Sequence, residues 1–305
     1  MSRTLVALSV VFCRSSAFQP CTRLLLAGNQ FTTSNRRKMT INTGPATKIP
    51  MQTKDRCIEV EQKFSTANLD KILQNMSDLG FIPGKEIKFM DWYFDNPDFT
   101  LCKQDCWLRL RHLSHVPGEK GLWQLKKGRR IPIGTASGSG STVYEELEGD
   151  QAIDIVKGLL EADEVTGNDA KSDGDDATLD GYPMPQIPRM GEYRMKAFAR
   201  IETTRSSWKT CATTNKESDE VYNNITIDID RTDFGHTVGE VETVVTSDEE
   251  VDGAKALVQQ VIIIINGEES SGSLPALGKL ESYLIQNRPE VYEACVKSGS
   301  MKANR

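Results

Sequence analysis

The chain has 305 residues, of which 38% are hydrophobic and 26% charged, a composition typical of a soluble globular protein. Its formal net charge is −6, yet residues 1–54 hold eight Lys or Arg and no Asp or Glu. Without that segment, 29 basic residues remain against 43 acidic ones, and so acidic a body disfavours nonspecific binding to nucleic acid.

Residues 1–50 are predicted to be a targeting segment for an organelle, either a plastid or a mitochondrion. The segment is basic and rich in Ser, Thr and Arg, and its apolar run at 5–13 is too short to span a bilayer. The alternative is a protein that starts at Met39 or Met51 and stays in the cytoplasm. We expect a monomer without a transmembrane helix and without a nucleic-acid or membrane partner.

Alternation of charged and apolar residues predicts that the first element, residues 58–64, is a β-strand. Side chains at i and i+2 of a strand point to the same face, so Glu59, Glu61 and Lys63 lie together. The other face is largely apolar and can pack. Two carboxylates and an ammonium group on one face can hold a cation and an anion together.

The remaining elements follow along the chain. Apolar residues at helical spacing predict helices at 66–80, 150–161, 249–265 and 276–297, and the strand-like propensity of 262–265 favours an early end to the third. Period-two patterns predict strands at 88–94, 107–111, 121–127, 142–148, 197–210, 222–230 and 237–246. The Gly/Ser run at 134–141 is predicted to connect a hairpin, and the polar stretch at 162–192 to be a flexible insertion. All of this fits one domain from about residue 55 to 298.

Several of these strands carry charge on one face only. Arg109 and Arg111 share a face with Trp107, and Glu240 and Glu242 also share a face. A repeated pattern of this kind predicts antiparallel β structure.

The ordered set of charged segments resembles the CYTH superfamily, the triphosphate tunnel metalloenzymes, and within it the thiamine triphosphatases. The segments that carry the resemblance are 58–64, 106–111, 204–209, 228–235, 238–242 and 279–289. The resemblance runs from about residue 57 to 297 and departs from the family at the leader, the Gly/Ser run and the insertion. It implies an α+β fold in which an eight-stranded antiparallel β-barrel, a triphosphate tunnel, is flanked by helices. It also implies metal-dependent hydrolysis of thiamine triphosphate to thiamine diphosphate and phosphate.

The residue types suit a triphosphate, whose negative charges require fixed cations and metal ions. Arginines offer paired donors to phosphate oxygens, and lysines act as compact point charges. The expected substrate-binding residues are Lys63, Trp107, Arg109, Arg111, Lys126, Arg205 and Lys279. Carboxylates are the ligands that Mg²⁺ prefers, with Mn²⁺ as an alternative ion. The expected metal ligands are Glu59, Glu61, Asp228, Glu240 and Glu242.

The catalytic residues are expected to be Glu59, Glu61 and Lys63, with the two carboxylates either binding a second ion or orienting the attacking water. Glu146 faces inward by parity and is expected to support the site, through metal-bound water or an arginine.

The resemblance implies that Trp107 packs against the thiazolium ring and that Lys279 closes one mouth of the tunnel over the phosphates. Asp230 and Asp233 are expected to support the turn that follows them rather than to bind metal.

Other functions remain open at this stage. The same tunnel suits an inorganic tripolyphosphatase or a nucleoside triphosphatase, because the phosphate grip does not choose the organic group. A class IV adenylate cyclase fits the later segments less well. A binding module without turnover is disfavoured, because a pure phosphate binder needs cations more than it needs five carboxylates.

Overall fold

A computed structural model describes residues 57–114, 120–129, 140–162, 178–187, 194–210, 222, 224–267 and 276–303. The predicted targeting segment at 1–50, residues 134–139 of the Gly/Ser run and most of the predicted insertion at 162–192 lie outside the described residues. All the described residues belong to one compact unit of the chain, residues 52–305.

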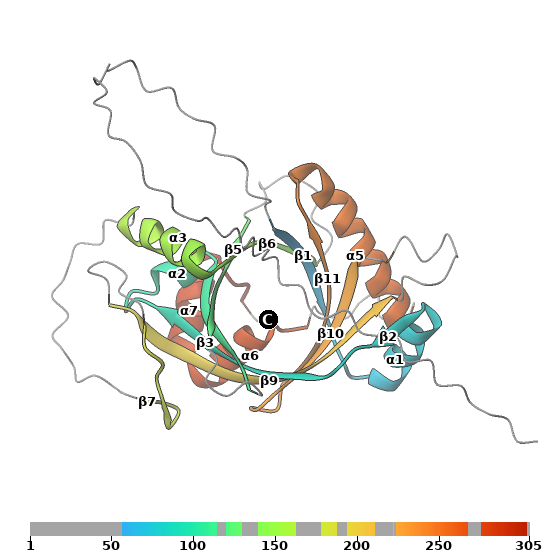
Figure 1. Ribbon diagram of the computed structural model, residues 1–305, viewed down its shortest axis with the longest axis horizontal. Coiled ribbons are helices and arrows are strands. Elements are labelled where there is room, and N and C mark those ends of the chain that lie inside the picture. Colours follow the sequence, from blue (N-terminus) through green and yellow to red (C-terminus); the bar gives the residue numbers. More distant parts are fainter. Residues whose placement is uncertain are drawn as a thin grey trace, which may run out of the picture. The chain divides into compact units, whose positions relative to one another are not determined.

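An antiparallel sheet closes on itself to form an eight-stranded barrel, which confirms the predicted fold class (Figure 1). In order around the barrel, its strands are β10 (Ile225–Thr232), β11 (Thr237–Val245), β1 (Ile58–Phe64), β6 (Thr142–Glu148), β5 (Leu122–Gly128), β4 (Cys106–Leu113), β3 (Ile87–Asp95) and β9 (Lys196–Thr210). The ring closes where β9 pairs with β10, so each of these strands has a partner on both sides. Closure turns one face of every strand toward a common interior.

Helices cover the outside of the barrel and one of its ends. They are α1 (Leu69–Asp78), α2 (Thr100–Lys103), α3 (Gly149–Ala162), α5 (Val251–Asn266), α6 (Lys279–Asn287) and α7 (Pro289–Ser298), with a 3₁₀ turn η1 (Asp248–Glu250) before α5. Figure 1 shows α3 beside β5 and β6, and α5 beside β1 and β11. The short strands are β2 (Phe81–Pro83), which extends the sheet beside β9, and the hairpin β7 (Thr178–Leu179) and β8 (Tyr182–Pro183).

Three apolar clusters hold these layers together, and each contributes through the removal of apolar surface from water. One lies between the barrel and helices α1 and α5, and includes Val60, Ile227 and Val258. A second lies under α3, around Leu108 and Leu125. The third joins α6 and α7 to the strands at one end of the barrel. The first two clusters leave the polar face of each strand free to line the interior.

Two of the predicted helices differ from those in the structure, one by a break and one by its end. The helix predicted at 276–297 is two helices, because Arg288 has a non-helical backbone (φ −141°, ψ 61°) and Pro289 begins α7. The early end predicted within 262–265 is wrong, since α5 continues to Asn266. Burial of Ile262 and Ile265 against the barrel overrides their weak helix propensity.

In the described part of the chain, no helix combines the length and the apolar character that crossing a lipid bilayer requires. Within the stretch predicted as an insertion, residues 178–187 are described and contain the β7–β8 hairpin. The apolar side chains of Leu179, Met184 and Ile187 belong to the cluster under α3. This part of the stretch therefore packs against the barrel.

We expect Gly239→Ala to destabilise the fold by roughly 1–3 kcal/mol, because overpacking a close-packed site forces its neighbours to move. A Cβ atom at Gly239 on β11 would lie 2.1 Å from the ring of the buried Phe64 on β1. Urea unfolding followed by circular dichroism measures the change.

Gly158→Ala is the matched control, since this exposed glycine lies within α3 and a Cβ atom added there would meet open space. There the substitution is expected to stabilise by about 0.5–1 kcal/mol through helix propensity alone. Equal effects of the two substitutions would contradict the packing argument.

Candidate active site

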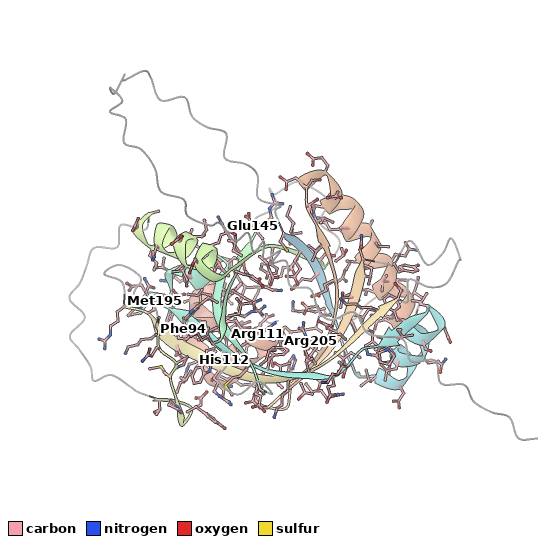
Figure 2. The ribbon with its side chains drawn as sticks, in the orientation of Figure 1. Phe94, Arg111, His112, Glu145, Met195 and Arg205 are labelled. Carbon is pink, nitrogen blue, oxygen red and sulfur yellow. The ribbon has the colours of Figure 1, made fainter. Side chains whose placement is uncertain are left out.

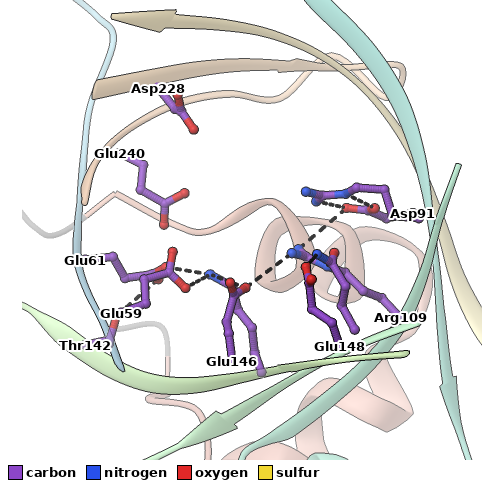
Figure 3. Close-up of polar contacts among 12 residues, drawn as sticks. Glu59, Glu61, Asp91, Arg109, Thr142, Glu146, Glu148, Asp228 and Glu240 are labelled. Atoms are coloured by element: carbon purple, nitrogen blue, oxygen red, sulfur yellow. Dashed lines mark hydrogen bonds and ion pairs between the residues drawn. The ribbon is translucent and has the colours of Figure 1, made fainter. Parts of the chain in front are cut away.

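The inward faces of the barrel strands carry opposed charges instead of an apolar core. Register places Glu61 opposite Glu242, and Lys63 and Asp228 each opposite Glu240. On the facing part of the barrel, Arg111 lies opposite Asp91. Figure 3 shows carboxylates of β1, β10 and β11 on one side of the interior and the Arg109 and Asp91 pair on the other.

The carboxylates of β1 are held by two lysines from different strands. Lys126 Nζ lies 2.7 Å from Glu59 Oε2 and donates to Glu61 Oε2 at 2.9 Å. Lys63 donates to Glu61 and, at 2.9 Å, to Glu240 Oε1. Thr142 adds a hydrogen bond to Glu61 at 3.2 Å.

Lys126 and Lys63 control the protonation state of Glu61. Burial alone would raise the pKa of Glu61, but Lys126 and Lys63 lower it to about 2. Burial alone would lower the pKa of Lys63, yet Glu240 and Glu61 raise it well above the ordinary lysine value. Glu61 and Lys63 are therefore both charged at neutral pH.

The paired arginines of β4 depend on an aspartate that the sequence analysis did not select. Arg111 donates from Nε and Nη2 to the two oxygens of Asp91, both at 2.7 Å. Arg109 Nη1 lies 3.7 Å from the same carboxylate, while its Nε donates to Gln124 at 3.0 Å. Burial raises the pKa of Asp91, but Arg111 and Arg109 outweigh it and bring it to about 2. The signal was present, since Asp91 is the one acid among the apolar residues of 89–94.

The third arginine forms the centre of a second network. Arg205 donates from Nε and Nη2 to Asp230 at 2.7 Å and pairs through Nη1 with Asp228. Lys279, at the start of α6, also donates to Asp230. The expectation that Asp230 supports the following turn is therefore wrong. Asp233 does hold that region, because its carboxylate accepts from Arg200 and from the backbone N–H of Glu202.

Three of these cations lie near the aromatic ring of Phe89. The guanidinium of Arg111 lies 4.0 Å from the centre of the Phe89 ring, and Arg205 and Lys279 each lie 5.5 Å from it. Figure 2 shows Arg111 and Arg205 directed into the ring of strands. Phe89 is 1% exposed, so its face is available to these cations only inside the barrel. Sequence reasoning did not identify Phe89 as part of the site.

Acidic charge on β10 and β11 exceeds what the nearby cations neutralise. Burial, followed by the charges of Glu59 and Asp228, raises the pKa of Glu242 well above the ordinary glutamate value. Burial also raises the pKa of Asp228, despite the opposing effect of Arg205. Oδ1 of Asp228 is buried without a hydrogen-bond partner in the described part of the chain.

This acidic surface fits a divalent cation by its chemistry, since hard carboxylate oxygens and uncompensated negative charge both favour one. Within the described ranges, no three His, Cys, Asp or Glu side chains lie close enough together to hold a metal ion as they stand. The reason is that Glu59, Glu240 and Asp228 each turn toward a lysine or an arginine. Glu242 is the carboxylate of this group whose raised pKa most strongly indicates a need for added positive charge.

Trp107 lies on the same interior face but at the end of the barrel that α6 and α7 cover. Its indole belongs to the apolar cluster that includes Tyr93, Phe198 and Tyr283, and only 8% of its surface is exposed. Nε1 donates to Asp105 at 2.9 Å, which fixes the plane of the ring. The interior is thus polar along most of its length and aromatic at this end.

All the predicted site residues lie on the inward face or on α6, and ion pairs connect most of them. Glu146 lies 3.5 Å from Arg109 and 3.9 Å from Lys126, so it links the arginine pair to the β1 carboxylates. Trp107 and Glu242 stand apart from these ion pairs, Trp107 in the aromatic cluster and Glu242 beside Thr226 and Lys209 at a pocket of about 330 Å³.

Comparisons with known proteins agree with this architecture. A model of the CYTH domain matches residues 57–272. Thiamine-triphosphatases of Homo sapiens and Macaca fascicularis are each 28% identical to this chain over 245 residues, which cover 80% of this chain and 92% of theirs.

Solved structures are similar at lower identity. A proposed adenylate cyclase from Vibrio parahaemolyticus has 15% identity and a TM-score of 0.42, over 74% of this chain and 98% of that one. A proposed adenylyl cyclase from Hippeastrum, described as having a dominant triphosphatase activity, has 16% identity and a TM-score of 0.38, over 78% and 95%.

We expect Glu242→Gln to stabilise the protein in the absence of divalent cations. A carboxyl group whose pKa is raised on folding favours its protonated form, so its charge at neutral pH costs stability. The free energy of unfolding at pH 8 in EDTA should rise by something on the order of 1 kcal/mol, the scale of one pKa unit. The gain should shrink as pH falls toward the ordinary glutamate pKa, because the wild-type carboxyl then becomes protonated.

The control for this change is Glu249→Gln, an exposed acid in η1, which should leave stability unchanged at either pH. Urea titrations at pH 8 and pH 5 make the comparison. A Glu242→Gln protein that is less stable than wild type at pH 8 would show that the charge is already neutralised.

Proposed function

The chain belongs to the CYTH domain family, and we propose that it is a Mg²⁺-dependent hydrolase that converts thiamine triphosphate to thiamine diphosphate and phosphate. One observation carries the proposal. The barrel interior brings Arg109, Arg111 and Arg205 to face carboxylates from three other strands, and a triphosphate requires such a combination of cations and metal ligands.

Binding would exchange the partners of the interior cations. Arg109, Arg111 and Arg205 are aligned in the free protein by Asp91 and Asp230, so they are already placed to donate paired hydrogen bonds to phosphate oxygens. Preorganised donors of this kind stabilise negative charge without a reorganisation cost during the reaction.

Carboxylates from β1, β10 and β11 would hold the metal. The donor set is Glu59, Glu61, Asp228, Glu240 and Glu242. When bound, Mg²⁺ supplies positive charge to neutralise the phosphates and polarise the reacting phosphoryl group.

The low pKa of Glu61 limits what this carboxylate can do in the reaction. A carboxylate with a pKa of about 2 takes up little proton at neutral pH, so Glu61 acts by orienting water and by holding Lys63 and Lys126. Lys63 stays protonated and supplies a point charge to the phosphates.

The aromatic side chains at one end of the barrel favour a substrate with an organic group on the triphosphate. Trp107 is held by Asp105 with its ring among apolar side chains, where a cationic thiazolium would gain a cation–π contact. The curated relatives that are 28% identical are named thiamine-triphosphatases, which favours the same substrate here. An inorganic tripolyphosphatase or a nucleoside triphosphatase is the second candidate, because the arginines and lysines would bind the phosphates and not the organic group.

We expect the purified full-length protein to release phosphate from thiamine triphosphate when Mg²⁺ is present and to stop when EDTA removes it. Arg111→Ala and Glu61→Ala should each lower kcat/KM by about 100-fold or more, since each removes a charge that faces the phosphates. Arg231→Ala is the matched control, because Arg231 is largely exposed and pairs with Glu86 on the surface. Hydrolysis that survives EDTA, or the loss of activity in Arg231→Ala alone, would argue against the proposed site.

The choice of substrate is tested by Trp107→Ala. We expect KM for thiamine triphosphate to rise by about tenfold, the scale of one desolvated cation–π contact, with KM for inorganic tripolyphosphate nearly unchanged. Side-by-side kinetics with the two substrates give the ratio, which is insensitive to a general loss of folded protein. Equal losses for both, or faster turnover of tripolyphosphate by the wild type, would favour the inorganic substrate.

A further inference from the structure

The β7–β8 hairpin lies within the stretch that distinguishes this chain from the family pattern, and its turn is well defined. Leu179 pairs with Tyr182, which leaves Asp180 and Gly181 as a two-residue loop. Both have positive φ, 53° and 81°, the combination that a type I′ turn requires and that Asp-Gly favours. The Asp-Gly dipeptide is thus a turn signal inside a stretch whose composition predicts a flexible insertion.

The hairpin is fixed to β9 by a stacked arginine. The guanidinium of Arg200 lies 3.6 Å from the centre of the Tyr182 ring, and its Nη1 donates to Asp233 at 2.9 Å. Leu179 is buried in the cluster under α3. Packing therefore holds the hairpin against the barrel, and its turn is held toward α6 and α7.

At the tip of the turn, Asp180 contacts α6 and the residue that joins α6 to α7. It accepts a hydrogen bond from the Tyr283 hydroxyl of α6 at 2.5 Å, and its other oxygen lies 3.6 Å from Arg288, which joins α6 to α7. Burial and then the Asp180 carboxylate raise the pKa of the Tyr283 phenol, so the hydroxyl remains a donor at neutral pH.

Tyr283 and Lys279 are four residues apart on α6 and so share one face of the helix. Lys279 reaches into the tunnel and donates to Asp230, the partner of Arg205. A second contact supports the start of the same helix, because the His236 ring lies 3.0 Å from the carbonyl oxygen of Leu277. The ring of Tyr283 also meets Phe234 edge-on, with ring centres 5.6 Å apart.

We propose that Asp180 is a positioning residue for the triphosphate site, which sets the rotation of α6 through Tyr283 and thereby places Lys279 in the tunnel. The proposal rests on the proposed function only in taking Lys279 to act on the phosphates. Its structural part, the control of α6 by the hairpin, stands independently of the substrate.

A double-mutant cycle tests the coupling between the hairpin and Lys279. Tyr283→Phe removes one hydroxyl while the ring stays packed, and Asp180→Asn removes the charge while keeping a residue that a type I′ turn accepts. We expect Tyr283→Phe to lower kcat by about fivefold, the scale of one hydrogen bond. In the background of Lys279→Met, the same change should have no further effect on kcat. Equal fold-changes in both backgrounds would overturn the proposal and leave Tyr283 a purely structural residue.

Tyr292→Phe is the matched control, since it also removes one tyrosine hydroxyl from a C-terminal helix, and the Tyr292 hydroxyl of α7 donates to the backbone carbonyl of Lys302. It should leave kcat unchanged in either background. Asp180→Asn should resemble Tyr283→Phe in direction, with the smaller effect, because an amide oxygen still accepts the hydrogen bond.

Hydrogen exchange separates failure of this proposal from failure of the proposed function. If the hairpin controls α6, Tyr283→Phe should speed amide exchange in residues 279–287 while leaving β1 and β11 unchanged, whether or not any triphosphate is hydrolysed. Unchanged exchange in α6 would reject the positioning role. Wild-type protein that neither binds nor hydrolyses inorganic tripolyphosphate or thiamine triphosphate, with faster α6 exchange in the variant, would reject the proposed function alone.

Discussion

The pairing of buried charges inside a closed barrel is the constraint on which the rest of the structure depends. Each interior arginine forms an ion pair with a carboxylate on a neighbouring strand, as Arg111 does with Asp91 and Arg205 with Asp230. Removing one partner of such a pair leaves an uncompensated charge, which costs far more than the net gain of the pair. The apolar clusters must therefore supply the stability, and they lie outside the barrel and at one end.

That separation explains how one sheet serves two purposes. Residues of one parity, such as Val60 and Leu108, meet the covering helices and remove apolar surface from water. Residues of the other parity face the interior, where Glu61 pairs with Lys126 and Arg109 lies beside Glu146. Because the side-chain period of a strand is two, a slip of one residue would exchange the faces and destroy both.

The interior charges are balanced unevenly. Near β1, β4 and β5, lysines and arginines lower the pKa of Glu61 and Asp91 to about 2. On β10 and β11, burial and then like charges raise the pKa of Glu242 and Asp228, whereas Arg205 and Lys279 outweigh burial and lower the pKa of Asp230. The interior thus holds ionised carboxylates beside fixed cations, together with Glu242 and Asp228, whose charge an added cation would stabilise.

The sequence by itself determined the eight strands of the barrel, the shared face of Glu59, Arg111 and Glu240 with their strand neighbours, and the family, because period-two patterns and residue order are local properties of the chain. Only the tertiary structure showed the partners. Asp91 and Phe89 read as members of an apolar strand, and Asp230 as a turn residue, until barrel closure placed them beside Arg111 and Arg205. Asp180 gained its contact with Tyr283 in the same way, across 103 residues of chain. Pairings of this kind depend on register and packing between distant segments, which no local pattern encodes.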